Sequence, residues 1–225
     1  MKALRERAEA IDFDCREVEF VLRIAEEIER ANLNHPVLYA GSGGDVEHAV
    51  VLGNELIFID SHEPEITLNE IRSRIERMGG VVLREKREGV LGRGGRHEIE
   101  FDFFGRIRLI YYAEDATKFV PPEARDGISV YFVKVPHPKE PNVGSLSSPE
   151  SLSRFLSLIV VGGFYLEREC PLCRSLRPVD LGFVKVASGY ISALSIYNVE
   201  GNLYKKVRDV PNLYELLKMD LAQKI

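Results

Sequence analysis

The chain has no tryptophan, only three methionines and only three cysteines in 225 residues. A structural zinc site usually takes its four ligands from two cysteine pairs or from one pair and histidines. Cys170 and Cys173 form one such pair, but Cys15 is far away in the sequence and the histidines show no metal-ligand spacing. We therefore expect no metal site. For the pair three alternatives stay open: two ordinary thiols, a redox pair, or half of a site completed by a second subunit in a homodimer.

Long apolar runs are also missing. The longest lies near residues 156–163, far short of the roughly 20 residues that a membrane-spanning helix needs. The N-terminus is charged and lacks the apolar region of a signal peptide. These absences predict a cytoplasmic protein without a membrane partner.

A surplus of positive charge is absent as well. The formal net charge is −5 and the isoelectric point is near 5.7. Basic clusters at 84–87 and 93–96 have acids interleaved with them or close by. This charge pattern disfavours nucleic acid as a partner. With 45% hydrophobic residues, a chain of this length can bury the core of a single domain.

What the chain does contain is a glycine-rich turn between two apolar runs. Residues 37–45 read VLYAGSGGD and residues 56–60 read LIFID. Glycines let the backbone turn tightly and approach a ligand closely, and amides at the start of a helix favour an electron-rich group. Asp60, at the tip of the next strand, could accept hydrogen bonds from both hydroxyls of a ribose. The pattern predicts a nucleoside site at the carboxyl ends of parallel strands, the alternative being a turn without a ligand.

Two nucleoside fingerprints can be compared with this turn. A dinucleotide site has the spacing G-x-G-x-x-G, and Val46 stands where its last glycine belongs. The turn more closely resembles V-L-D-x-G-x-G-x-G, the first motif of class I S-adenosylmethionine-dependent methyltransferases. The resemblance implies S-adenosylmethionine as cofactor, with Asp60 on the ribose and Asp115 on the adenine amino group. The cofactor-binding residues that it implies are Gly41, Ser42, Gly43, Asp45, Asp60, Asp115 and Ala116.

The turn departs from the family pattern at two positions. Tyr39 occupies the position where the family usually has an aspartate, whose carboxylate helps to bind the amino group of the methionine portion. Asp45 replaces the final glycine. We expect Asp45 to compensate for the missing acid.

Strand and helix signals alternate along the chain with short loops between them. They predict a doubly wound α/β fold, Rossmann-like as in that family, with a seven-stranded, mostly parallel sheet and helices on both faces. We expect one domain over 1–225. Its parts are an N-terminal helical segment at 1–34 with a helix over 14–30, an inserted β-hairpin at 81–105, a closing antiparallel pair at 181–186 and 190–199, and a C-terminal extension at 200–225.

The acceptor side of the reaction has a weaker signature. Many N-methyltransferases carry Asp/Asn-Pro-Pro-aromatic after the fourth strand, whereas this chain has VPHP at 135–138. His137 is the candidate catalytic base, because imidazole titrates near neutrality and this strand end should face the cofactor. An ordinary exposed loop histidine is the alternative. The sequence names no methyl acceptor.

The predicted function is that of an S-adenosylmethionine-dependent methyltransferase-like protein. One alternative is a nucleoside-binding or scaffold protein that keeps the fold without turnover. A second is an enzyme like the polyamine aminopropyltransferases, whose Gly-Gly-Asp turn and segment YYAEDATKF at 111–119 look similar. The chain lacks the N-terminal β-domain of that family and its acidic cluster after the fourth strand, so this alternative ranks last.

Overall fold

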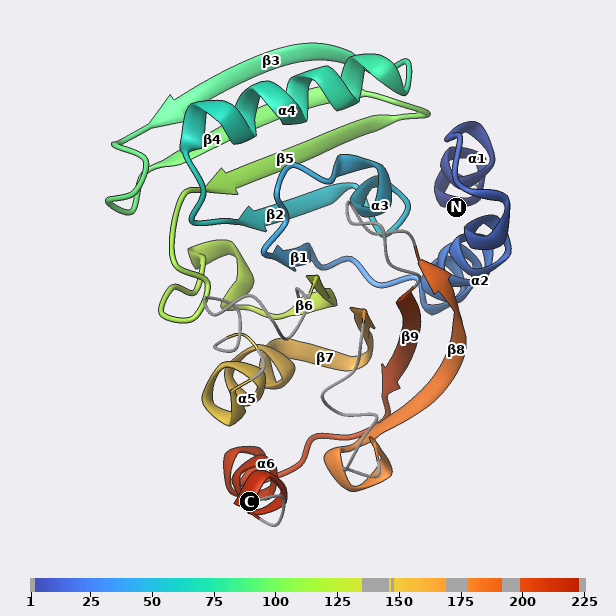
Figure 1. Cartoon of the computed structure of the whole chain (residues 1–225), viewed down its shortest axis with the longest axis vertical. Helices are drawn as coiled ribbons and strands as arrows, with labels where there is room; N and C mark the ends of the chain where they lie inside the picture. The colour runs from blue at the N-terminus through green and yellow to red at the C-terminus, as the bar shows by residue number, and fades with distance from the viewer. Residues whose placement is uncertain (1–2, 135–145, 147, 169–177, 192–198, 223–225) are drawn as a thin grey trace.

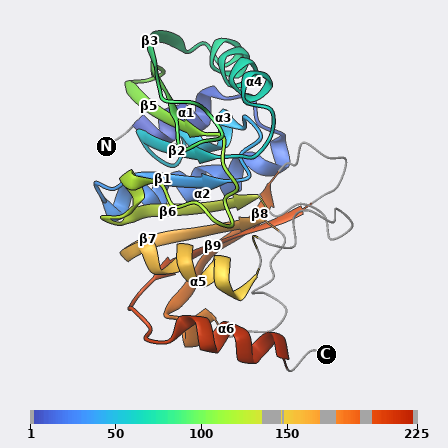
Figure 2. The same cartoon turned by 90° about the vertical axis from the view of Figure 1, so that its left-hand side faces the viewer.

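The computed structural model describes residues 3–134, 146, 148–168, 178–191 and 199–222. Within these residues the chain forms one nine-stranded sheet in the order β3-β4-β5-β2-β1-β6-β7-β9-β8. Helices lie on both of its faces (Figures 1 and 2). The predicted doubly wound α/β fold is therefore confirmed. The sheet has two strands more than the predicted seven, because the inserted hairpin joins the same sheet.

Five parallel strands make up the centre of the sheet. They are β1 (Val37–Ala40), β2 (Glu55–Ile59), β5 (Arg106–Tyr112), β6 (Ile128–Lys134) and β7 (Ile159–Arg168). β1 pairs with both β2 and β6, and every residue of β1 is buried. A strand covered on both faces needs a continuous apolar run, as VLYA and LIFI provide. Because these five strands are parallel, their carboxyl ends lie at the same edge of the sheet.

The inserted hairpin consists of β3 (Val81–Glu88) and β4 (Arg96–Asp102) and extends the sheet beyond β5. β3 is an edge strand, and most of its residues are exposed. Its middle reads REKR, and charged side chains on an edge strand discourage pairing with another chain.

The closing strands differ from the expectation. Residues 183–186 and 190–191 of the predicted pair at 181–186 and 190–199 belong to one strand, β8 (Phe183–Ile191), whose partner is β9 (Val199–Lys206). Residues 192–198 lie outside the described part of the chain. β9 lies between β7 and β8 and is antiparallel to both, so residues 200–206 belong to the sheet rather than to an extension. The segment Ala-Ser-Gly at 187–189 reads as a turn signal. It continues the strand because Gly189 pairs with Gly201 beneath α2.

The helices divide between the two faces of the sheet (Figure 2). The first face carries α1 (Ala3–Ala10), α2 (Cys15–Ala31), α3 (Val46–Val50) and α4 (Pro64–Arg77). The second face carries α5 (Pro149–Leu158) and α6 (Leu213–Ala222). Two short 3₁₀ helices, η1 (Pro122–Ala124) and η2 (Pro178–Leu181), lie in connections. No helix within the described residues is both long and apolar enough to span a membrane.

The predicted helix over 14–30 is confirmed as α2. Asp14 caps its N-terminus by accepting from the amide of Arg16, and Asn32 ends it in a left-handed conformation. Phe20 sits over the paired glycines of β8 and β9. A Cβ added at Gly189 would lie 2.5 Å from the Cβ of Phe20, so glycine is what allows α2 to approach the sheet this closely.

Arg7 ties α1 to two turns at the amino ends of the strands. Its buried guanidinium donates to the carbonyl of Val50 at the end of α3 and to that of Gly53 after the helix. It also donates to the carbonyls of Phe103 and Phe104 in the β4–β5 turn. Burial lowers the pKa of Arg7 to about 10, and the group therefore remains charged at neutral pH.

Candidate functional site

The turn between β1 and α3 has the conformation that only glycine adopts readily. Backbone φ is +68° at Gly41, +51° at Gly43 and +82° at Gly44. The amide of Gly41 donates to the carbonyl of Ile59 at 2.9 Å, which fixes the start of the turn to the end of β2. The turn thus lies at the carboxyl edge of the parallel strands.

One side of this turn is open and the other is packed. A Cβ added at Gly43 would meet nothing within 4 Å, whereas one added at Gly44 would lie 3.2 Å from the side chain of Glu70 on α4. Ser42 is buried, and its hydroxyl has no hydrogen-bond partner within the described part of the chain. Buried hydroxyls are normally paired, so Ser42 leaves hydrogen-bonding capacity unused inside the turn.

Asp60 follows β2 directly and directs its carboxylate at the turn. One oxygen accepts from the amide of Gly43 at 2.7 Å. The other accepts from the amide of His62 at 2.9 Å and pairs with the ring nitrogen Nδ1 of the same residue. The Asp60 side chain is 3% exposed and that of His62 is 79% exposed. A carboxylate can accept about four hydrogen bonds, so Asp60 has room for two more once the exposed His62 ring turns aside.

Asp115 and Ala116 follow β5, the strand next to β2. The carboxylate of Asp115 accepts from the hydroxyl of Thr117 at 2.6 Å and from its amide at 2.9 Å, and the side chain is 46% exposed. The bond from the Thr117 hydroxyl is the main reason why the pKa of Asp115 is lowered. Ala116 is buried against the second face of the sheet. Both residues therefore lie at the same edge as Asp60.

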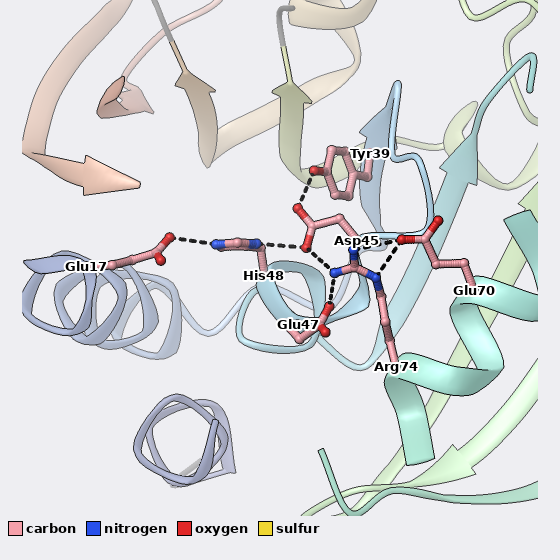
Figure 3. A network of polar contacts seen from close by, with 7 residues as sticks. All are labelled: Glu17, Tyr39, Asp45, Glu47, His48, Glu70 and Arg74. Carbon is pink, nitrogen blue, oxygen red and sulfur yellow. Dashed lines mark hydrogen bonds and ion pairs between the residues drawn. The ribbon is translucent and has the colours of Figure 1, made fainter. Parts of the chain in front are cut away.

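Asp45 faces the protein interior rather than the open side of the turn (Figure 3). Its buried carboxylate accepts from the hydroxyl of Tyr39 at 2.8 Å and lies 2.8 Å from Nδ1 of His48. Tyr39, at the position where the family has an acid, thus binds Asp45 from β1. The expected compensation by Asp45 does not follow from this geometry, because the carboxylate is directed inward by its partners.

His48 continues this network toward α2. Its Nε2 lies 2.6 Å from the carboxylate of Glu17, whose side chain is fully buried. Burial opposes protonation of the ring, but the nearby carboxylates of Asp45 and Glu17 outweigh it and raise the pKa of His48 to about 9. The imidazole is therefore charged at neutral pH and bonded on both nitrogens.

Arg74 on α4 lies on the other side of the Asp45 carboxylate. Its guanidinium pairs with Glu47 at 2.8 Å and with Glu70 at 2.7 Å, and lies 4.0 Å from Asp45. Burial opposes the charge on Arg74, but the bonds to these two glutamates raise its pKa above the ordinary value. The turn is thus supported from beneath by residues of β1, α2, α3 and α4.

The structure brings Gly41, Ser42, Gly43 and Asp60 together at one edge of the sheet, with Asp115 and Ala116 after the neighbouring strand. His137, Cys170 and Cys173 lie outside the described residues. Within residues that are described, no group of three His, Cys, Asp or Glu side chains could hold a metal ion.

A separate cavity of about 640 Å³ lies at the opposite, amino ends of the strands. Asn32, His35, Asn54 and Arg108 contribute to its lining. None of the predicted cofactor-binding residues reaches it, so this cavity is distinct from the glycine-rich turn.

Sequence reasoning missed the network beneath the turn. The spacing of Asp45 and His48, three residues apart at the start of a helix, was a local signal for their contact. Glu17 lies 31 positions before His48, and no periodicity in the sequence connects the two. Glu17, His48 and Arg74 are therefore found only from the folded chain.

No protein-family model and no curated protein matches the chain. Three solved structures illustrate the similarity in fold. The N-methyltransferase NodS from Bradyrhizobium japonicum is 12% identical, with 88% of this chain and 100% of that one covered at a TM-score of 0.51. An rRNA methylase from Streptococcus thermophilus is 11% identical, with 88% and 100% covered at 0.49.

TrmN from Thermus thermophilus is 18% identical and matches 90% of this chain at a TM-score of 0.47. The present chain spans only 52% of the length of TrmN. At such identities the comparison with NodS speaks to the fold alone. Together with the strand order, it shows that the chain has a Rossmann-like α/β fold, the fold of the methyltransferase NodS.

Proposed function

We propose that the chain binds S-adenosylmethionine at the open side of the glycine-rich turn and transfers its methyl group to an acceptor. The observation that carries this proposal is the open backbone of Gly43 held against the carboxylate of Asp60 at the carboxyl edge of the sheet. Ligands of open α/β sheets bind at this edge. NodS, which shares the fold, has also been solved with S-adenosyl-L-homocysteine bound.

The residues of the turn fit such a cofactor. The unhindered backbone at Gly43 lets the ligand approach, Asp60 has acceptor capacity for the two ribose hydroxyls, and Asp115 is exposed enough to accept from the adenine amino group. When bound, the cofactor supplies an electrophilic methyl group on a sulfonium. The protein contributes mainly by positioning donor and acceptor. Asp45 is left out of the ligand set, because its carboxylate supports the turn from beneath.

The acceptor remains open in this proposal. The net charge of −5 disfavoured nucleic acid, but one structure that shares the fold is an rRNA methylase, and net charge alone does not decide the acceptor. Small amines, carboxylates, proteins and RNA therefore all belong in an activity assay. His137 stays the proposed base on sequence grounds.

The decisive experiment is calorimetry of the purified protein with S-adenosyl-L-homocysteine, S-adenosylmethionine, NAD and ATP. We expect the first two to bind and the others to bind far more weakly. Asp60→Asn keeps the shape of the side chain but removes its charge, and should weaken binding by about 1.5–3 kcal/mol per lost bond. Glu55→Gln, at the amino end of the same strand, is the matched control. Absence of binding to either methionine nucleoside at millimolar concentration would overturn the proposal.

A binding protein without turnover is the second candidate. It is favoured by Tyr39, which occupies the position of the family acid and uses its hydroxyl to bind Asp45. Labelled methyl donor incubated with cell extract separates the two functions. Label in a small-molecule, protein or RNA fraction that disappears with Asp60→Asn supports the enzyme, and His137→Ala should then lower turnover with cofactor affinity retained. Tight binding with no labelled fraction supports the binding protein.

A further inference from the structure

The glycine-rich turn is joined to α2 through a single histidine. His48 lies between two carboxylates, with Nδ1 at 2.8 Å from Asp45 and Nε2 at 2.6 Å from Glu17 (Figure 3). Asp45 belongs to the glycine-rich turn and Glu17 to the first helical turn of α2. All three side chains are buried, so solvent does not substitute for these bonds.

The chemistry of imidazole makes this arrangement dependent on a proton. A charged ring donates from both nitrogens and satisfies both carboxylates, whereas a neutral ring donates from only one. Loss of the proton would therefore leave one buried carboxylate facing a nitrogen lone pair. The charged or titratable groups around the ring come from β1, α2, α3 and α4, and they are Tyr39, Glu17, Asp45, Glu47, Glu70 and Arg74.

Helix α2 is also held at the far end of the sheet. Phe20 fills the space above Gly189 and Gly201, and the guanidinium of Arg16 stacks 4.4 Å from the ring centre of Tyr190 on β8. The helix thus spans from the closing strands to the residues beneath the turn. A change in the contact between α2 and His48 would therefore affect both the closing strands and the residues beneath the turn.

We propose that His48 is a positioning residue for the cofactor turn, and that its bond to Glu17 couples the docking of α2 to cofactor binding. This inference rests on the proposed function. Asp45 immediately precedes α3 and its amide donates to the carbonyl of Ser42, so its position sets the curvature of the turn. When His48 releases Asp45, the turn loses one of its inner supports, and the amide of Gly43 is held less firmly against Asp60.

The first test measures the affinity for S-adenosyl-L-homocysteine by calorimetry between pH 7 and pH 10. The wild-type affinity should fall as the pH rises through about 9. His48→Gln should bind about tenfold more weakly at pH 7, because one charge-assisted bond is lost, and should show no further fall in this range. The ratio of the two affinities cancels the ionisation of the ligand itself. Thermal unfolding of each variant verifies that it is folded.

Glu17→Gln provides a second, milder variant. It removes one of the two carboxylates that favour the charged ring, so the fall in affinity should move to lower pH than in the wild type. Glu19→Gln, an exposed position on the same helix, is the matched control and should leave the profile unchanged. If Glu17 had only a structural role, its substitution would change the affinity at all pH values without moving the pH at which the affinity falls.

Amide hydrogen exchange tests the coupling directly. Adding S-adenosyl-L-homocysteine should slow exchange in the turn and in α2 of the wild type, but only in the turn of His48→Gln. Equal protection of α2 in both proteins, or identical pH profiles, would overturn the coupling while leaving the cofactor site intact. Absence of any binding by the wild type would instead overturn the proposed function.

Discussion

At the scale of single residues, two buried tyrosine hydroxyls differ in whether they form a hydrogen bond. The hydroxyl of Tyr39 donates to Asp45, whereas that of Tyr131 on β6 is buried with no hydrogen-bond partner within the described residues. Burial raises the pKa of Tyr131 above the ordinary value. Both residues lie in adjacent strands, at register positions one apart, but face opposite sides of the sheet.

Replacing each tyrosine by phenylalanine should therefore have different effects on the free energy of unfolding. Tyr39→Phe should lower the free energy of unfolding by about 1.5–3 kcal/mol, because a bond to a buried carboxylate is lost. Tyr131→Phe removes a hydroxyl that is buried without a partner and should be neutral or stabilising. Urea unfolding of both variants measures the difference. A large destabilisation by Tyr131→Phe would show that its hydroxyl has a role.

Arg7 is a second residue whose effect should exceed that of its neighbours. Arg7→Met keeps much of the side-chain volume but removes the bonds to carbonyls at the end of α3 and in the β4–β5 turn. We expect a loss of about 3 kcal/mol or more in urea unfolding, since each bond of a charged donor contributes about 1.5–3 kcal/mol. Arg5→Met on the same helix is the control. Its ion pairs with Glu9 and Glu26 are exposed, so we expect little change in the free energy of unfolding.

At the scale of elements, the contact between α2 and the closing strands should reverse the usual effect of glycine. Alanine normally stabilises a strand relative to glycine by about 0.5–1 kcal/mol. Gly189→Ala should instead destabilise the protein by about 1–3 kcal/mol, because its Cβ would overlap with Phe20. In a Phe20→Ala background the same substitution should become neutral or favourable. Urea unfolding of the four proteins completes the cycle, and additive effects would exclude this contact as the cause.

The elements that the sequence predicts well are those with local signals. Asp14 and the apolar spacing after it define α2 to within one residue, since capping and periodicity act over a few positions. The closing strands were misplaced because the signal is not local. Ala-Ser-Gly at 187–189 has the composition of a turn, and only the distant Phe20 explains why it stays in a strand.

The candidate site also has a part that the sequence predicts and a part that it does not. The position of Asp60 beside the turn follows from the order of β1 and β2 along the chain, and could be predicted. The inward direction of Asp45 could not, because it depends on Tyr39 before the turn and on His48, whose other partner Glu17 lies in α2.

At the scale of the whole molecule, the pH dependence of stability should carry the signature of His48. Its pKa is raised in the folded state to about 9 from 6.5, so its contribution is fully present below pH 6.5 and is lost as the pH rises through 9. The loss should be on the order of 3 kcal/mol, at about 1.4 kcal/mol for each pKa unit.

Urea unfolding between pH 6 and pH 10 measures this loss. The difference in unfolding free energy between the wild type and His48→Gln should shrink across the range, while groups common to both proteins cancel. A constant difference would mean that His48 is neutral in the folded protein.

The packing of Phe20 against β8 and β9 affects the order in which parts of the protein can fold during synthesis. Phe20 is translated well before Gly189 and Gly201, the two glycines against which its ring packs. Helix α2 therefore cannot complete its docking on β8 and β9 until residue 201 has been translated. A nascent chain halted before residue 201 already contains every residue of the glycine-rich turn, and still lacks the surface that holds α2, and with it Glu17, in place.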